Sequence, residues 1–214
     1  MPKGLEMTAF DWEKHWEKVE EPEGARQFAL RFADMLAGFI ETNFIESVAN
    51  YGCGPATTIL ALTRRFPRVS FHGFDAAASI ISKNREKARR EGIGNISFER
   101  DSLPHPQIEL SFDLVTCLST LHYVEDVEGA LTTLYGRLNP GGHMIFNYPS
   151  RYTRWVKIKE IQPDDEQNMR RFALLLAGRN IISIRRIGEV LGVRPRKFYS
   201  SVRHNIYAVV RNNN

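Results

Sequence analysis

The chain has little cysteine, no long apolar run and no leader-like start, and each absence excludes a class of protein. Cys53 and Cys117 are the two cysteines among 214 residues, too few for a disulfide framework or a cysteine-based metal site. No apolar stretch approaches the roughly 20 residues that span a bilayer. Residues 1–6 contain no apolar core, so we expect no signal peptide, no membrane partner and a cytoplasmic protein.

Charge is unevenly distributed along the chain. Residues 1–150 hold 15 Lys and Arg against 20 Asp and Glu, whereas residues 151–214 hold 14 against 5. A basic C-terminal third raises the local concentration of an anionic partner, which leaves an anionic metabolite, a lipid headgroup and RNA open. An ordinary solvated basic surface gives the same pattern. The content of 43% hydrophobic and 25% charged residues is typical of one soluble domain with a full core.

A glycine loop between a predicted strand and a predicted helix is the most informative stretch. An apolar run from Phe44 to Val48 leads to Gly52 and Gly54, and a helical apolar pattern begins at Ile59. Glycine lets the loop adopt left-handed dihedral angles and lets a ligand approach its backbone. The amides that open the next helix favour negative charge. The stretch predicts a nucleotide-type ligand site, with a simple tight turn as the alternative.

Four further strands are predicted at 69–75, 96–101, 112–119 and within 138–146, with helices between them. This alternation specifies a parallel sheet covered by helices on both sides. Ligands in such sheets bind beyond the carboxyl ends of the strands. The polar residues at these ends are Asn50, Asp75, Asp101, Ser119 and Tyr148.

The remaining periodicity predicts the other elements. We expect helices over 28–40, 76–90, 126–138, 163–176 and 183–191, and strands over 197–200 and 205–210. Ser183 is the expected N-cap of the last helix and Gly192 its end.

Taken in order, the motifs between residues 44 and 148 resemble the class I methyltransferases that use S-adenosylmethionine. The resemblance implies an α/β fold with a doubly wound, mostly parallel sheet of seven strands, Rossmann-like, with the last strand antiparallel. It divides the chain into an N-terminal helical segment (1–43), a cofactor-binding core (44–148), a helical insertion as candidate substrate cap (149–183) and a closing helix and strand pair (184–214).

The resemblance also assigns residues to the cofactor S-adenosylmethionine and its product S-adenosylhomocysteine. The glycine loop would contact the methionine part, Asp75 the ribose hydroxyls, and Asp101 and Ser102 the adenine. The implied cofactor-binding residues are Asn50, Tyr51, Gly52, Cys53, Gly54, Asp75, Ala76, Asp101, Ser102, Leu118 and Ser119.

Two positions depart from the family pattern. Asn50 stands where an acid is usual, and Ala56 where a third glycine is frequent. Asn50 still accepts a hydrogen bond from the amino group of the cofactor but brings no charge. A catalytically silent cofactor-binding regulatory protein therefore remains an alternative. A nicotinamide dehydrogenase is disfavoured, because its glycine pattern needs a glycine where the chain has Thr57.

His122 is the candidate catalytic residue. It follows the fourth strand, in the Leu-His-aromatic sequence that many small-molecule methyltransferases carry there. A histidine with a pKa of about 6.5 is able to take a proton from a hydroxyl or ammonium nucleophile. The alternative is a silent residue that packs beside the cofactor.

The candidate substrate-binding residues come from two segments. Trp12 and Trp16 share one face of a short helix and would form a lid over the cofactor or anchor the segment. Arginines interleaved with aromatics after the fifth strand suit an anionic group on a flat molecule or a single-stranded nucleotide; a basic surface helix is the alternative. The full set is Trp12, Trp16, Tyr148, Arg151, Arg154 and Trp155.

Missing motifs narrow the reaction. No Asn/Asp-Pro-Pro-aromatic motif follows the fourth strand, so methylation of adenine or glutamine amines is not expected. No paired-cysteine motif surrounds Cys117, and no metal-ligand cluster is present. We therefore expect methyl transfer to a small, anionic molecule without a metal, with RNA methylation as the alternative. No pattern indicates an oligomeric state.

Overall fold

The computed structural model describes residues 10–200 and 206–213. Seven strands form one sheet in the order β3-β2-β1-β4-β5-β7-β6. The strands are β1 Ser47–Tyr51, β2 Ser70–Asp75, β3 Ile96–Arg100, β4 Phe112–Cys117, β5 Leu138–Asn147, β6 Arg196–Ser200 and β7 Ile206–Arg211. β1 to β5 are parallel, and β7 is antiparallel to β5 and β6. The predicted fold class, including the antiparallel last strand, is confirmed.

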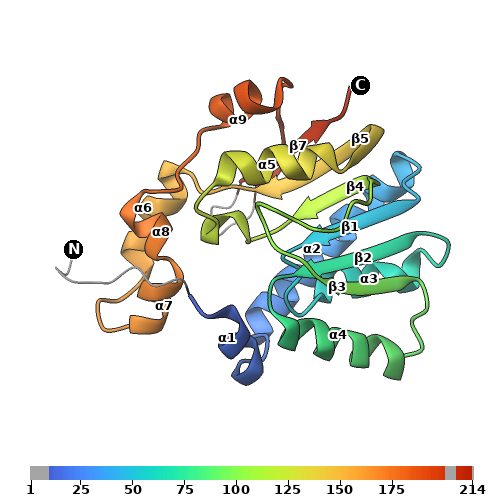
Figure 1. The fold of residues 1–214 in the computed structure, drawn as a ribbon, viewed down its shortest axis with the longest axis horizontal. Coiled ribbons are helices and arrows are strands. Elements are labelled where there is room, and N and C mark those ends of the chain that lie inside the picture. The colour runs from blue at the N-terminus through green and yellow to red at the C-terminus, as the bar shows by residue number, and fades with distance from the viewer. Residues whose placement is uncertain (1–9, 201–205, 214) are drawn as a thin grey trace.

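Helices cover both faces of the sheet (Figure 1). They are α1 Trp12–Lys18, α2 Glu23–Thr42, α3 Thr57–Arg65, α4 Ala78–Arg90, α5 Val127–Gly136, α6 Arg151–Glu160, α7 Glu166–Arg171, α8 Ala173–Ala177 and α9 Ile184–Leu191, with a 3₁₀ turn η1 at Leu121–Tyr123. The helices α2 and α3 pack on one face and α5 and α9 on the other. The helices α6, α7 and α8 lie together beyond one end of the sheet, with α1 nearby (Figure 1).

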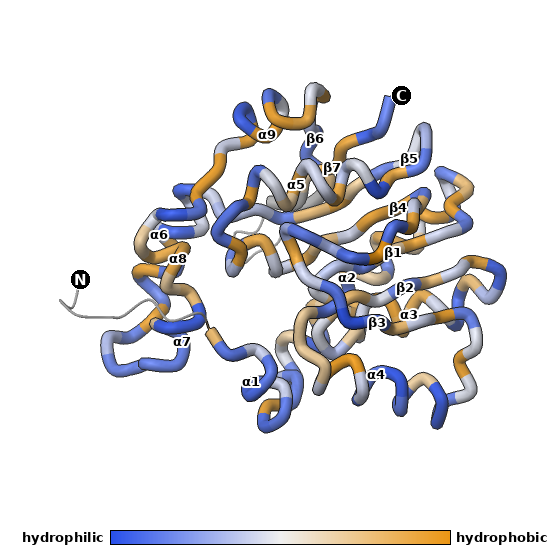
Figure 2. The backbone as a smooth tube through the Cα atoms, in the orientation of Figure 1, coloured by the Kyte–Doolittle hydropathy of each residue, from blue (hydrophilic) through white to orange (hydrophobic). Residues whose placement is uncertain are grey.

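Alternation along the central strands builds two cores. Val48 and Leu114 face the core under α2 and α3, while the following residues Ala49 and Val115 face the core under α5 and α9. This period of two is what a strand buried on both faces requires. Figure 2 shows mostly hydrophobic residues along β4, as burial on both faces demands.

The structure moves several predicted boundaries. Phe44 is 88% exposed with a φ of 53°, so it belongs to the turn after α2, and β1 begins only at Ser47. Leu138 is a strand residue, because it pairs with Phe112; the preceding helix ends at Gly136. The prediction of a helix through Leu138 was wrong.

The segment between β5 and α9 also differs from expectation. The single helix predicted over 163–176 is two short helices, α7 and α8, separated at Phe172, whose φ of −101° and ψ of 16° interrupt the helix. The helix α9 begins and ends as predicted, with the Ser183 side chain accepting from the Arg186 amide and Gly192 left-handed. The predicted start of the last strand at Asn205, and the N-terminal residues 1–9, lie outside the described residues.

Within the described ranges, no helix combines the length and apolar character needed to cross a bilayer.

Candidate active site

The glycine loop after β1 is shaped by three closely spaced departures from ordinary backbone. Gly52 and Gly54 have φ values of 68° and 48°, and Ala56, at the N-cap of α3, has a φ of 57°. A Cβ atom on Gly52 would lie 2.0 Å from Thr120 Oγ1. Position 52 therefore excludes side chains both by dihedral angle and by space, and the loop lies directly against the segment after β4.

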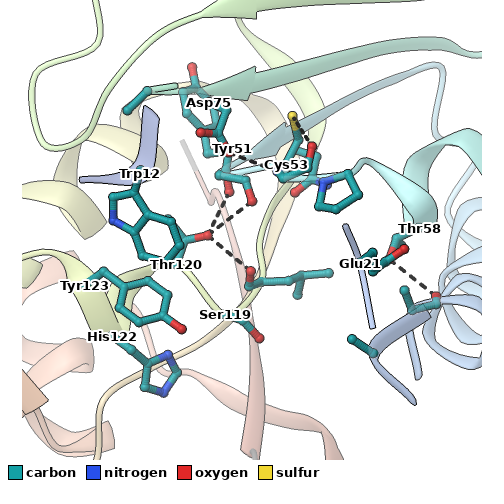
Figure 3. Close-up of a pocket in the computed structure, with 18 of the residues that line it drawn as sticks. Trp12, Glu21, Tyr51, Cys53, Thr58, Asp75, Ser119, Thr120, His122 and Tyr123 are labelled. Atoms are coloured by element: carbon teal, nitrogen blue, oxygen red, sulfur yellow. Dashed lines mark hydrogen bonds between the residues drawn. The ribbon is translucent and has the colours of Figure 1, made fainter. Parts of the chain in front are cut away.

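A cavity of about 710 Å³ opens beyond the carboxyl ends of β1, β2, β3 and β4 (Figure 3). Every predicted cofactor-binding residue lines it, from Asn50 on β1 to Ser119 after β4. In Figure 3, Trp12, Tyr123 and His122 lie on one side of the cavity and Glu21 and Thr58 on the other. The described residues contain no group of three or more His, Cys, Asp or Glu side chains able to hold a metal.

Asp75 ends β2 at the cavity wall. Its carboxylate accepts hydrogen bonds from the amides of Gly54 (2.9 Å) and Ala77 (3.1 Å). Burial raises the pKa of Asp75, and these two hydrogen bonds act in the opposite direction. Two amides fix the carboxylate while leaving further acceptor positions, which suits a ligand with two neighbouring hydroxyl groups.

Asp101 has a structural task at the end of β3. Its Oδ1 atom accepts from the amides of Ser102 and Gln107, each at 2.9 Å, and its Oδ2 atom from Ile108 at 3.3 Å. The carboxylate thereby holds the loop 102–108 in place beside the cavity. Ser102 is the more exposed of the predicted adenine pair, and both residues line the cavity.

Asn50 carries an unused acceptor. The side chain is buried, and its Oδ1 atom has no hydrogen-bond partner in the described part of the chain. A buried acceptor without a partner costs about 1–3 kcal/mol. Because Asn50 lines the cavity, an ammonium or amino group bound there would remove that cost. This feature fits the amino group of S-adenosylmethionine.

His122 lies in η1, at the junction of β4 and the cavity. It is 5% exposed, and burial, aided by the nearby charge of Lys157, lowers its pKa to about 4. The imidazole is therefore neutral at pH 7. A neutral imidazole orients a ligand through hydrogen bonds, but with this pKa it is a weak base.

The helix α6 covers the cavity with a different face from the one predicted. Its lining residues are Thr153, Val156, Lys157 and Glu160, which share one side of the helix at spacings of three and four. The expectation that Tyr148, Arg151, Arg154 and Trp155 face the site is corrected, because none of them lines this cavity.

Each of those four residues has another environment. Tyr148 packs in the core under α5, and the Arg154 Nε atom donates to the Leu176 carbonyl at 3.0 Å. Trp155 is 52% exposed with the Lys159 amine 3.9 Å from its ring centroid. Arg151 is exposed on the first turn of α6. Helical phasing from the N-cap Ser150, whose hydroxyl accepts from the Thr153 amide, was the signal that could have identified the correct face.

Trp12 and Trp16 both line the cavity. The Trp16 ring is the nearest group to the position that a Cβ atom on Gly54 would occupy, at 3.4 Å. The helix α1 is also anchored: Glu13 accepts from the Ala78 amide at 2.6 Å and the Ser79 amide at 2.8 Å, at the N-terminus of α4. The helix α1 is thus anchored to the domain, and its two tryptophans lie at the cavity.

Sequence reasoning missed a cluster on α7 and η1. Arg171, Phe172 and Tyr123 line the cavity. Arg171 and Tyr123 contact Trp12, which is about 160 residues away in the chain from Arg171. No local pattern reveals such a long-range contact.

Comparisons with known proteins agree with this geometry. A family model described as a methyltransferase domain matches residues 50–144. Trans-aconitate 2-methyltransferase of Pseudomonas aeruginosa is 31% identical over 152 residues, covering 69% of this chain and 52% of the relative. The enzyme of the same name from Pseudomonas paraeruginosa is 29% identical over 147 residues, covering 68% and 51%. The chain thus spans about half the length of the curated relatives it matches.

A solved structure shows a similar fold over nearly the whole chain. Magnesium protoporphyrin IX methyltransferase from Synechocystis PCC 6803, with bound S-adenosylhomocysteine, has a TM-score of 0.65 at 16% identity, covering 94% of this chain and 92% of that one. The glycine loop, the strand-end acids and these matches lead to one conclusion: the chain belongs to the class I S-adenosylmethionine-dependent methyltransferase family.

Proposed function

We propose that the chain transfers a methyl group from S-adenosylmethionine to a carboxylate oxygen of a small anionic molecule. The observation that carries the proposal is the cavity that joins the glycine loop and Asp75 to the neutral His122 and the cationic Arg171. In the proposal, Asn50 and the glycine loop hold the amino acid part of the cofactor, and Asp75 holds its ribose. The cofactor supplies the electrophilic methyl group.

The acceptor is inferred from the state of His122. Methyl transfer requires an unprotonated nucleophile in line with the methyl carbon, and orientation contributes up to roughly 7–11 kcal/mol. A histidine with a pKa of about 4 is poorly suited to remove a proton from a hydroxyl or ammonium group at pH 7. A carboxylate is already ionised and needs no base, so we assign His122 to orienting the acceptor.

The names of the relatives support this acceptor class. Curated relatives from several bacteria are named trans-aconitate 2-methyltransferase, and aconitate is a carboxylate. Because this chain covers about half of those relatives, the substrate itself is part of the proposal. The division of the chain into a cofactor core and a substrate cap is likewise proposed.

The basic C-terminal third gives little support to RNA as substrate. Many of its arginines contact acids of the same chain, and the pairs are Arg170–Glu166, Arg179–Glu125, Arg185–Glu189 and Arg186–Glu128. Paired cations add less to the field that attracts a polyanion. No observation favours a catalytically silent regulatory role.

The test is transfer of labelled methyl from S-adenosylmethionine to a panel of di- and tricarboxylates, with the corresponding alcohols and amines as controls. The expected products are methyl esters, which release labelled methanol in base. Label that is stable to base, or label found only on alcohols, amines or RNA, would overturn the carboxylate assignment.

A further inference from the structure

Arg171, the last residue of α7, lies in the cavity wall between aromatic rings from three segments. Its guanidinium carbon is 5.3 Å from the ring centroid of Trp12, 5.4 Å from that of Tyr123 and 5.6 Å from that of Phe172. Its Nε atom donates to the Tyr123 hydroxyl at 3.2 Å. The rings and this hydrogen bond fix the guanidinium on the cavity side of the cap.

The charge of Arg171 has no counter-ion in the described part of the chain. The other cation of the cavity wall, Lys157, is paired with Glu160 at 2.6 Å. No carboxylate among the described residues lies within the 4.0 Å of an ion pair with Arg171. Of these two cavity cations, Arg171 is the one available to a ligand.

The remaining acids of the cavity are also engaged. Asp75 and Asp101 accept backbone amides at the ends of their strands, and Glu21 accepts the hydroxyl of Thr57. These three carboxylates line the part of the cavity assigned to the cofactor or the opposite wall. They therefore leave the guanidinium unneutralised.

A guanidinium in this setting is suited to a carboxylate. It is planar and weakly hydrated, and its terminal nitrogens present a fork that binds both oxygens of a carboxylate. Aromatic neighbours exclude water from its faces, which strengthens the attraction to an anion. Nε is already used by Tyr123, so the Nη atoms remain for the ligand.

We propose that Arg171 determines specificity by binding a second carboxylate of the substrate, separate from the carboxylate that accepts the methyl group. This inference rests on the proposed function and refines it to molecules with at least two carboxylates. The Trp12 ring packs on the guanidinium of Arg171, so in this proposal Trp12 lies beside the bound carboxylate.

The kinetic test compares Arg171→Gln and Arg171→Lys with the control Arg170→Gln, whose side chain is exposed and outside the cavity. For a dicarboxylate, Arg171→Gln should raise KM by roughly 10- to 100-fold with a smaller change in kcat, and Arg171→Lys should restore part of the loss. The Kd of S-adenosylhomocysteine should stay within about twofold in all variants, because Arg171 lies outside the residues assigned to the cofactor. A monocarboxylate ester of the same molecule should show little difference between variants.

A binding test is independent of turnover. In a Trp155→Phe background, Trp12 and Trp16 are the remaining tryptophans, and both line the cavity. Titrating a dicarboxylate into the complex with S-adenosylhomocysteine should change the tryptophan emission, and Arg171→Gln should abolish that change.

The outcomes separate this inference from the proposed function. Equal dicarboxylate affinity in wild type and Arg171→Gln, with S-adenosylhomocysteine bound normally, would overturn the role of Arg171 alone. Absence of methyl transfer by wild type to every carboxylate would overturn the proposed function, while the emission titration would still decide whether Arg171 binds the anion. If Arg171→Gln fails to bind S-adenosylhomocysteine, the same titration is made with Arg171→Lys. Weaker dicarboxylate binding by Arg171→Lys than by wild type supports the proposal, and equal binding overturns it.

Discussion

At the residue scale, His122 is a buried and neutral imidazole. Because burial lowers its pKa, the free energy of unfolding depends on pH. Its pKa in the folded chain is about 4, below the usual 6.5, so the unfolded chain takes up this proton first as the pH falls. The stabilisation from keeping His122 neutral is complete above about pH 6.5 and is lost progressively down to about pH 4.

The first prediction concerns the pH dependence of folding. Between pH 7 and pH 4.5, the free energy of unfolding of His122→Asn should fall by about 2 kcal/mol less than that of wild type. Urea unfolding at both pH values measures this difference. His105→Asn, which changes an exposed histidine, serves as the control and should follow wild type. Identical pH dependence for His122→Asn and wild type would contradict a lowered pKa.

The second prediction concerns Gly52. Gly52→Ala introduces a methyl group at a φ of 68° and 2.0 Å from the Thr120 hydroxyl, so it should destabilise the fold by at least about 1–3 kcal/mol and weaken cofactor binding. Gly38→Ala is the matched control, because Gly38 is an exposed residue of α2 with no atom near its Cβ position; it should stabilise by about 0.5–1 kcal/mol. Unfolding curves and calorimetric binding read both effects, and wild-type behaviour of Gly52→Ala would refute the loop geometry.

At the element scale, α1 is attached to α4 through several polar contacts. Glu13 receives both amides at the start of α4, Ser79 donates its hydroxyl to the Glu13 carbonyl, and Lys83 donates to the carbonyl of Trp16. A short helix outside the main core, attached to its neighbour by polar contacts, opens at a lower free energy than the core. The two tryptophans that cover the cavity depend on this attachment.

The third prediction follows from that attachment. Glu13→Ala removes a cap worth about 0.5–2 kcal/mol, so amide hydrogen exchange in residues 12–18 should become faster. The affinity for S-adenosylhomocysteine should fall, roughly tenfold at most. Glu17→Ala, on the exposed face of the same helix, should leave both unchanged. Unchanged exchange in Glu13→Ala would show that α1 is held by other contacts.

Element boundaries were predicted best where the side chain itself sets them. Ser183 and Gly192 delimit α9 as expected, because a hydroxyl cap and a left-handed glycine act locally. Leu138 was predicted in a helix because an apolar residue at this position fits the spacing of a helix as well as that of a strand. Its pairing with Phe112 shows that it belongs to β5. The interruption at Phe172 likewise has no local signal.

At the scale of the whole molecule, the order of the sequence motifs predicts the sheet topology and the residues at the cofactor end of the cavity. The strand-end residues Asn50, Asp75 and Asp101 meet at one edge because parallel strands present their carboxyl ends on the same side. The substrate end does not follow, since it is assembled from α1, η1, α6 and α7, which are distant in sequence. Arg171 therefore emerged only from the three-dimensional contacts with Trp12 and Tyr123.

Whether the cavity binds the methyl donor is decided by a calorimetric titration of the protein and of Asp75→Ala with S-adenosylmethionine and S-adenosylhomocysteine, with NAD as the control ligand. We expect micromolar binding of the first two to wild type, no binding of NAD, and at least tenfold weaker binding to Asp75→Ala, because a ligand with two neighbouring hydroxyls loses a charged acceptor. Failure of wild type to bind either methyl-cofactor form, or full affinity in a folded Asp75→Ala protein, would contradict the assignment of the cavity.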